Sequence, residues 1–430
     1  MFIAVDDTDS RKGMCTTFLA TELIKEFDDY RLLDYPRLVR LNPNVPWKTR
    51  GNGAIVLSLG EGSEKDKKIG EAEEELWIYQ GEHVMDEKAF SRARNVVETF
   101  AHSAASETNP GLIVSENRTP EYLYERAVKG VVKLEEVLGI LEDDGFMYRG
   151  YGKKRGLIGA SAALAWRPND FTYELLSYRR EEMWGESRDI KNSSVKKLDK
   201  EFKHSFDSYD RELNKQTIAP TSPCPVLYGV RGDHPLELQK ALDIVEGELP
   251  ERWVTFLTNQ ATDDHIQKKE LCESESWNSV RVTGDVSSEP RPIEGGHVLF
   301  EIDDGTDKIT AAAYEPTKSF RDVVNKLIEG DRLELYGGIR KEPRTLNIEK
   351  MRVIDLEDKI VKVSNPECPN CGKNMSSMGK NAGYRCKRCR TKADEDEVER
   401  KKVERNISEG WYEVPVSARR HLSKPLKRMG

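Results

Sequence analysis

Apolar runs and amphipathic segments alternate irregularly over the first 270 residues. Short apolar runs predict strands at residues 2–5, 37–40, 54–59, 112–114, 173–179, 225–230 and 253–258. Apolar positions at helical spacing predict helices at residues 15–27, 89–106, 121–142 and 234–246, and the charge-rich segment 63–75 is expected to open a surface helix. Strands and helices mixed in this way favour an α+β fold over a doubly wound sheet.

The pattern changes near residue 278, where short strands begin to dominate. We expect strands at residues 279–283, 297–302, 308–313, 332–338 and 345–355. A helix at 320–328 lies between the third and the fourth of them. Five strands with a helix before the fourth are typical of an OB-fold barrel, and another small all-β module is the alternative.

Length and composition point to several globular domains. The chain has 430 residues, of which 37% are hydrophobic and 33% charged, and this length predicts two to four domains. The sequence contains no apolar stretch as long as the roughly 18 residues of a membrane span and no signal-peptide pattern, so we expect a cytoplasmic protein without a membrane partner. The net charge is −8, yet residues 365–430 carry 16 Lys and Arg against 9 Asp and Glu, which suggests that this end contacts polyanions.

Four of the seven cysteines form two C-x2-C knuckles. Cys368 and Cys371 are followed after fourteen residues by Cys386 and Cys389, a spacing that places four thiolates around one zinc ion. Four unrelated buried thiols and a redox pair are the alternatives. Basic side chains around the knuckles are expected to contact a phosphate backbone, namely Lys387, Arg388 and Arg390.

Three carboxylates, Asp6, Asp7 and Asp9, follow the first predicted strand. Such a cluster repels itself unless a divalent cation neutralises it, and hard oxygen ligands suit Mg²⁺. The cluster therefore predicts a magnesium site, with an ordinary Asp-rich turn as the alternative.

Two segments combine fixed cations with glycines that let backbone N–H groups approach an anion. The candidate phosphate-binding residues are Lys48, Thr49, Arg50, Gly51 and Asn52 in the first segment, and Lys153, Lys154 and Arg155 in the second. Such clusters also mark ordinary surface turns. The sequence carries neither a Walker A loop nor a dinucleotide-binding glycine motif, so any use of ATP would rely on another loop.

The C-terminal residues interleave aromatic and basic side chains. Trp411, Arg419, Arg420 and Lys424 are therefore candidate RNA contacts, through stacking and charge. A disordered basic tail is the alternative.

Eight strings appear together and in order along the whole chain. Besides the cysteine knuckles they are DDTDS (6–10), GMCTT (13–17), NPNVPWKTRGNG (42–53), GYGKKRGLIGA (150–160), CPVLYGVRGD (224–233), TNQATDDH (258–265) and ARRHLSKPL (418–426). The chain thereby resembles the archaeal tRNA(Ile) 2-agmatinylcytidine synthetase family. The resemblance implies a kinase-like catalytic domain (1–115), a ferredoxin-like domain (116–270), an OB-fold (278–357), a zinc ribbon (365–391) and a basic C-terminal segment (392–430).

The resemblance also implies an activity. Members of this family use ATP to join agmatine to the 2-position of the wobble cytidine in tRNA(Ile) with a CAU anticodon, through a phosphorylated cytidine, so that the tRNA decodes AUA. ATP, Mg²⁺ and Zn²⁺ are the implied cofactors. The family's autophosphorylated threonine maps to Thr16 or Thr17, with Thr17 preferred. For agmatine, Asp233, Asp263 and Asp264 are candidate ligands, although each also suits a structural capping role.

Two other functions remain open. One is a non-catalytic RNA-binding protein built from an OB-fold and a zinc ribbon, and the other is a tRNA ligase or kinase with different chemistry on the same modules. The first alternative explains residues 278–430 but leaves the carboxylate cluster and the 48–53 segment without a role.

Overall fold

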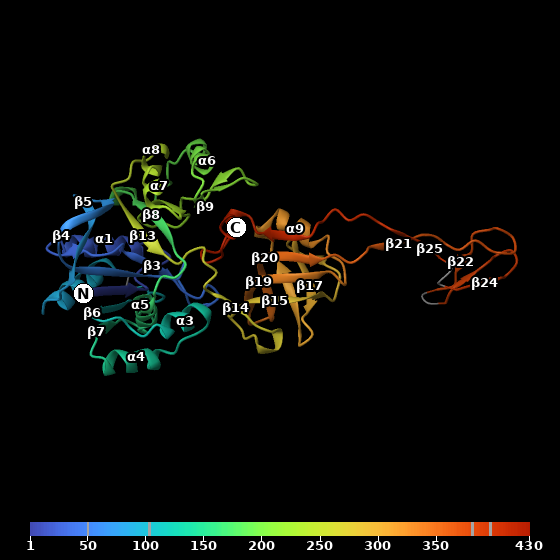
Figure 1. The fold of residues 1–430 in the computed structure, drawn as a ribbon, viewed down its shortest axis with the longest axis horizontal. Helices are drawn as coiled ribbons and strands as arrows, with labels where there is room; N and C mark the ends of the chain where they lie inside the picture. Colours follow the sequence, from blue (N-terminus) through green and yellow to red (C-terminus); the bar gives the residue numbers. More distant parts are fainter. Residues whose placement is uncertain (50, 102–104, 380–381, 395–397) are drawn as a thin grey trace.

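The chain folds into a mixed α/β body, a β-barrel and a projecting arm (Figure 1). The structure is a computed structural model and describes residues 1–49, 51–101, 105–379, 382–394 and 398–430. No helix within these ranges is long and apolar enough to cross a membrane. The multidomain α+β architecture expected from the sequence is confirmed.

One sheet runs through the whole body. Its main path has the order β7-β6-β1-β4-β3-β13-β8-β12-β9, and β2 and β5 flank β4. β3 and β13 pair in parallel, which joins the N-terminal strands to those of residues 172–258. The strands are β1 (Phe2–Asp6), β2 (Arg31–Leu32), β3 (Arg37–Arg40), β4 (Gly53–Glu71), β5 (Glu75–His83), β6 (Gly111–Ser115), β7 (Met147–Gly150), β8 (Thr172–Tyr178), β9 (Ser205–Phe206), β12 (Val226–Gly232) and β13 (Arg252–Thr258).

Helices pack on this sheet in separate groups. They are α1 (Thr16–Glu26), α2 (Ala89–Phe100), α3 (Tyr122–Lys129), α4 (Leu134–Asp143), α5 (Gly156–Ala165), α6 (Asn192–Glu201), α7 (Pro235–Gln239) and α8 (Ala241–Ile244). The helix expected over 121–142 breaks into α3 and α4 at Gly130, the C-cap of α3, and the helix expected over 234–246 is also two short ones. The small-residue helix α5 is buried along nearly its whole length and packs on β1 and β6, so residues 123–166 contribute to the first hydrophobic core.

The surface helix expected over 63–75 is wrong, because β4 and β5 form a long hairpin there. A Cβ at Gly60 or Gly81 would collide with the backbone of the opposite strand, so these glycines set the close pairing. Lys68 pairs with Glu71 and Glu75. The pairing of strands thus overrides the helix propensity of the charged residues.

The barrel closes as expected. Its strands are β15 (Ser279–Val286), β17 (His297–Asp303), β18 (Lys308–Ala313), β19 (Arg332–Arg340) and β20 (Thr345–Asp355), with α9 (Ser319–Val324) before β19. β15 pairs with both β17 and β19, and β18 pairs with β20 in parallel, so the five strands form a ring. The closed five-stranded barrel with a helix before its fourth strand is confirmed.

Short strands extend the barrel and build the arm. β14 (Ile266–Lys268), β16 (Arg291–Ile293) and β26 (Gly410–Glu413) join the barrel sheet, while β10 (Tyr209–Asp210) pairs with β11 (Lys215–Gln216) in the body. In the arm, β21 (Ile360–Ser364) pairs with β25 (Glu399–Lys402), and β22 (Ser376–Ser377), β23 (Tyr384–Arg385) and β24 (Lys392–Ala393) form a small sheet at its tip (Figure 1). Residues 394–405, expected as a helix or linker, thus include a strand.

After β26 the chain returns to the body as an ordered segment, residues 414–430, here called the C-terminal strap. Figure 1 shows the C-terminus between the barrel and the body. The backbone N–H groups of Ala261 and Asp263 donate to the carbonyl oxygens of His421 and Leu422, at 2.8 and 2.9 Å. The alternative of a disordered basic tail is therefore wrong.

Candidate active site

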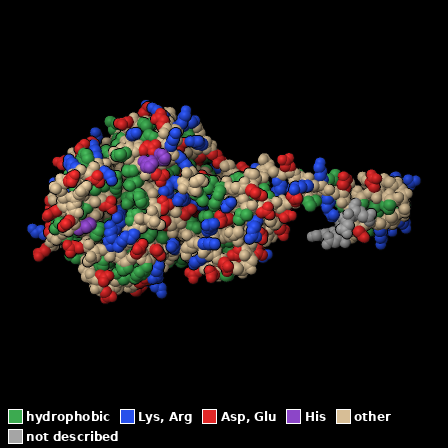
Figure 2. All heavy atoms as spheres, in the orientation of Figure 1, with side chains coloured by type: hydrophobic (Ala, Val, Ile, Leu, Met, Phe, Trp, Pro, Cys, Tyr) green, Lys and Arg blue, Asp and Glu red, His purple; other side chains and the backbone are tan. Residues whose placement is uncertain are grey.

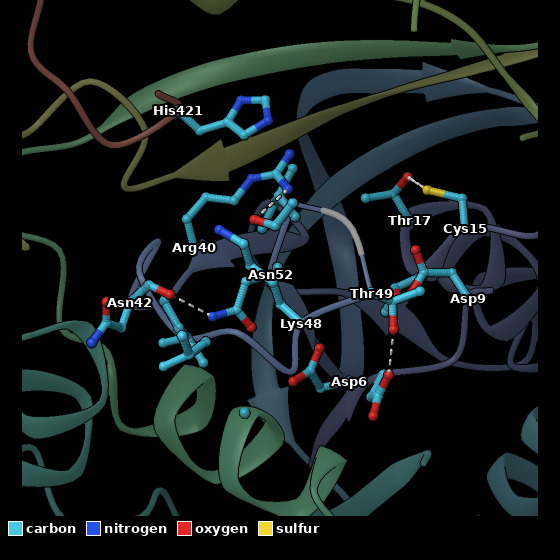
Figure 3. Close-up of a pocket in the computed structure, with 18 of the residues that line it drawn as sticks. Asp6, Asp9, Cys15, Thr17, Arg40, Asn42, Lys48, Thr49, Asn52 and His421 are labelled. Atoms are coloured by element: carbon cyan, nitrogen blue, oxygen red, sulfur yellow. Dashed lines mark hydrogen bonds between the residues drawn. The ribbon is translucent and has the colours of Figure 1, made fainter. Parts of the chain in front are cut away.

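A cavity of about 540 Å³ opens in the body and brings most of the expected site residues together. Residues from four distant strings line it: Asp6, Asp7, Asp9, Thr16, Thr17, Lys48, Thr49, Gly51, Asn52 and Arg155. Figure 3 shows several of them facing the same space from β1, α1 and the 42–53 loop. The two loops expected to hold phosphate thus meet the carboxylate cluster in one pocket.

Two of the expected phosphate ligands lie elsewhere. Lys153 and Lys154 are exposed and do not line the cavity, because the turn before α5 directs only Arg155 inward, where it stacks over Trp47 at 4.9 Å. The backbone N–H of Lys153 donates to Asn109. Arg50 lies outside the described residues.

The carboxylates are held in an environment that disfavours their charge. Burial, assisted by the charge of Asp7, raises the pKa of Asp6 to about 8, and burial raises the pKa of Asp7 to about 6. Asp7 accepts hydrogen bonds from Asn109 N–H at 3.1 Å and from the Thr49 hydroxyl at 3.3 Å. Gly159 of α5 lets the Asp6 carboxylate approach closely, since a Cβ there would overlap it. Crowded hard-oxygen donors with an unfavourable charge fit a Mg²⁺ ion.

The two threonines stand at the start of α1. The Thr8 hydroxyl donates to the Thr16 hydroxyl at 3.1 Å, and the Thr17 hydroxyl lies 3.1 Å from Cys15 Sγ (Figure 3). Both are buried in the cavity wall. A helix N-terminus favours negative charge, so a phosphoryl group on either hydroxyl would be stabilised there.

Sequence reasoning missed a group of cations and a histidine in the same cavity. Arg40 of β3, Arg231 of β12 and His421 of the C-terminal strap line it together with Lys48. The strings GVRGD and ARRHL contain two of these residues, but no spacing rule links them before the chain is folded.

Lys48 gives a prediction that depends on pH. Burial, followed by the charge of Arg420, lowers its pKa from 10.5 to about 8. The unfolded chain therefore holds this proton more tightly than the folded protein, so the charged lysine destabilises the fold fully below pH 8, and the penalty disappears as the pH rises to about 10.5. Lys48→Met is expected to raise the melting temperature by about 2 °C at pH 7 and to leave it unchanged near pH 10.

The same substitution should lower ATP-dependent activity at least about tenfold, because a phosphate-binding cation is lost. Thermal unfolding at both pH values and a rate assay check the prediction. A lower melting temperature at pH 7 would contradict it.

The four knuckle cysteines meet at the tip of the arm. Their Sγ atoms lie within 4.8 Å of one another, with Cys368 to Cys389 at 3.2 Å and Cys371 to Cys386 at 3.5 Å. Zinc–sulfur bonds of about 2.3 Å in a tetrahedron place sulfurs about 3.8 Å apart, so the cluster fits zinc. Nearby cations are exposed to solvent, namely Lys387, Arg388 and Arg390.

The expected RNA contacts of the C-terminus are mostly engaged inside the protein. Arg419 pairs with Asp207, Arg420 with Glu349 at 3.3 Å, and Lys424 with Asp170 at 2.8 Å. Trp411 lies 5.6 Å from Tyr336 on the barrel. The expectation of a free basic segment is therefore corrected: these cations tie the strap to the body, because their partner carboxylates are spread over segments that only folding brings near.

The three aspartates considered for agmatine are also engaged. Asp263 pairs with Lys350 at 2.5 Å, Asp264 accepts from the Tyr124 hydroxyl, and Asp233 pairs with Arg428 at 2.9 Å. These contacts favour the structural role.

The ion pair of Arg419 and Asp207 gives a stability prediction. Their side chains are 6% and 8% exposed, so Arg419→Met leaves a buried, poorly compensated carboxylate. We expect a loss of about 3–5 kcal/mol in the free energy of unfolding, measured by urea denaturation. Adding Asp207→Asn should recover most of this loss, and asparagine tolerates the positive φ of 57° at this position. A double variant no more stable than Arg419→Met would contradict the assignment.

A carboxylate- and cation-lined pocket joined to a barrel and a zinc cluster defines a multidomain enzyme that acts on nucleic acid. Family models match the chain as the TiaS TCKD domain (residues 2–153), the TiaS FLD domain (154–265) and the TiaS C-terminal zinc ribbon domain (365–407). A relative from Methanocaldococcus jannaschii, the 2-agmatinylcytidine synthetase TiaS of that organism, which acts on an isoleucine tRNA, is 42% identical over 99% of this chain and 98% of its own. The chain belongs to the TiaS family.

Solved structures agree over the full length. A complex of TiaS with its isoleucine tRNA and ATP has a TM-score of 0.86 and 39% identity, and a complex of TiaS with the tRNA, AMPCPP and agmatine has 0.84 and 36%. Each covers 100% of this chain, with 97% of its own length matched.

Proposed function

We propose that this protein joins agmatine to the 2-position of the wobble cytidine of tRNA(Ile) with a CAU anticodon, at the expense of ATP. The product, 2-agmatinylcytidine, would let the tRNA decode AUA. The observation that carries the proposal is the meeting of the family's separate strings in one pocket, supported by full-length likeness to TiaS complexes with tRNA, ATP and agmatine.

The chemistry requires activation of a poor leaving group. Phosphorylation of the cytidine 2-oxygen lets it leave as phosphate, while the primary amine of agmatine forms the new bond to C2 and loses a proton. Asp6, Asp7 and Asp9 would hold Mg²⁺, which neutralises phosphate charge when bound. Lys48 and Arg155 would orient phosphate oxygens, and Thr17 is the preferred phosphorylated residue, with Thr16 beside it. Positioning and charge stabilisation carry most of the rate in such transfers.

The division of labour follows the modules. A kinase-like domain (1–115) and a ferredoxin-like domain (116–270) would share the body, followed by the OB-fold (278–357), the zinc ribbon (365–391) and the C-terminal segment (392–430). Support for a joint catalytic body comes from its continuous sheet. The barrel and the arm would hold the tRNA, because the arm extends away from the pocket and carries exposed Lys and Arg side chains (Figure 2). The wobble base must leave its stack to enter the pocket.

Consumption of ATP distinguishes this function from that of a non-catalytic RNA-binding protein. We expect sustained ATP consumption by the purified protein only when tRNA(Ile) and agmatine are both present. Omission of agmatine should stop turnover after phosphorylation of the available acceptors. If the protein binds tRNA yet never consumes ATP, the RNA-binding alternative is correct.

A further inference from the structure

The cavity has a second charged wall besides the carboxylates. One buried carboxylate, Glu174, serves two guanidinium groups, with Arg231 Nε at 2.8 Å and Arg40 Nη2 at 3.9 Å. Burial would raise the pKa of Glu174, but the charges of Arg231 and Arg40 hold it below its usual range. Lys48 adds another cation, and its ammonium group donates to the Pro43 carbonyl oxygen. The wall formed by Arg40, Lys48, Arg231 and Glu174 therefore keeps an excess of positive charge.

Two polar atoms on this wall are buried and have no hydrogen-bond partner among the described residues: Arg40 Nε and His421 Nδ1. Burial and the charges of Arg40, Arg231 and Lys48 lower the pKa of His421 well below its ordinary value, so the imidazole is neutral. A neutral imidazole keeps one N–H group that can donate to an anion. Such buried, unsatisfied donors are costly unless a ligand meets them.

Arg40 and His421 converge on one point of the 42–53 loop. A Cβ at Gly51 would stand 3.5 Å from His421 Nε2 and would overlap an Arg40 guanidinium nitrogen. Arg40 Nη1 also donates weakly to the Gly51 carbonyl oxygen at 3.4 Å. Figure 3 shows His421 and Arg40 together on the side of the pocket away from Asp6. Glycine at position 51 thus keeps the space between these donors open.

We propose that Arg40, Arg231 and His421 form a phosphate subsite in the pocket, and that the C-terminal strap completes it by supplying His421. The site takes a phosphate oxyanion, which guanidinium groups bind through paired N–H donors. The inference rests on the proposed function, which offers two sources of that anion: the triphosphate of ATP and the RNA backbone beside the modified cytidine.

Two pocket variants and one strap control test the subsite. His421→Asn and Arg231→Gln each remove a phosphate donor, and Arg40 and Gln260 remain to hold Glu174 in the second variant. Lys427→Gln removes an exposed cation of the same strap, whose ammonium group donates to the Ser205 carbonyl oxygen away from the pocket lining. Affinity for the ATP analogue AMPCPP is measured without tRNA, and affinity for tRNA(Ile) without nucleotide.

Each pocket variant should weaken one of the two affinities about tenfold, whereas Lys427→Gln should leave AMPCPP affinity unchanged. A loss of AMPCPP affinity identifies ATP as the source, and a loss of tRNA affinity identifies the RNA backbone. Unchanged affinities for both ligands in folded variants overturn the subsite. Should the variants unfold, tripolyphosphate added without magnesium must raise the melting temperature of the unmodified protein, and no rise overturns the subsite. Failure of the unmodified protein to produce modified tRNA would instead overturn the proposed function.

Discussion

Asp7→Asn is expected to lower the rate of tRNA modification at least about a thousandfold and to change tRNA affinity less than about twofold. The substitution removes one negative charge from the cluster proposed to hold Mg²⁺, while an amide oxygen can still accept from Asn109 and Thr49. Asparagine also tolerates the positive φ of 55° at this position better than alanine does. Product formation at saturating tRNA and a separate binding titration measure the two effects.

The fold should survive this change, because burial already disfavours the Asp7 carboxylate by raising its pKa to about 6. Asp66→Asn on the exposed β4–β5 hairpin removes the same charge outside the pocket and should keep full activity. Full activity in purified Asp7→Asn protein would overturn the metal assignment.

Cys386→Ser is expected to abolish zinc binding and to reduce tRNA affinity about tenfold or more. Structural zinc supplies the folding energy of small modules of this kind, so the tip of the arm should unfold while the body stays intact. Metal analysis, tRNA titration and AMPCPP binding report on these three effects. Cys272→Ser alters an exposed cysteine outside the cluster and serves as the control.

Zinc content and tRNA affinity should fall together in Cys386→Ser, with AMPCPP affinity unchanged. Absence of tightly bound zinc from the unmodified protein, or wild-type tRNA affinity in the zinc-free variant, would show that the arm does not have this role.

Sequence reasoning located one half of the pocket because its chemistry is written in contiguous strings. Asp6, Asp7 and Asp9 follow a buried strand, and Lys48 to Asn52 form one loop, so local order alone keeps their functional groups close. The same reasoning failed for Lys153 and Lys154, since a string cannot show which of three adjacent cations a helix start turns inward.

The other half of the pocket depends on topology. Arg40, Arg231 and His421 meet only because β3, β12 and the C-terminal strap come together in the fold. The strap itself was misjudged for a related reason. A basic segment suggests solvent or RNA contact until its partners are known, and Asp207, Asp170 and Asp233 lie far from it in sequence. Long-range ion pairs leave no local periodicity.

Mass spectrometry of the tRNA product tests the central claim most directly. Purified protein is incubated with tRNA(Ile), ATP, magnesium and agmatine, and the digested nucleosides are compared with a reaction lacking agmatine. We expect the wobble cytidine to gain the mass of agmatine less one water, with no change at any other cytidine and no change in an elongator tRNA(Met) with the same anticodon. An unmodified wobble cytidine, or a product without agmatine, would contradict the account.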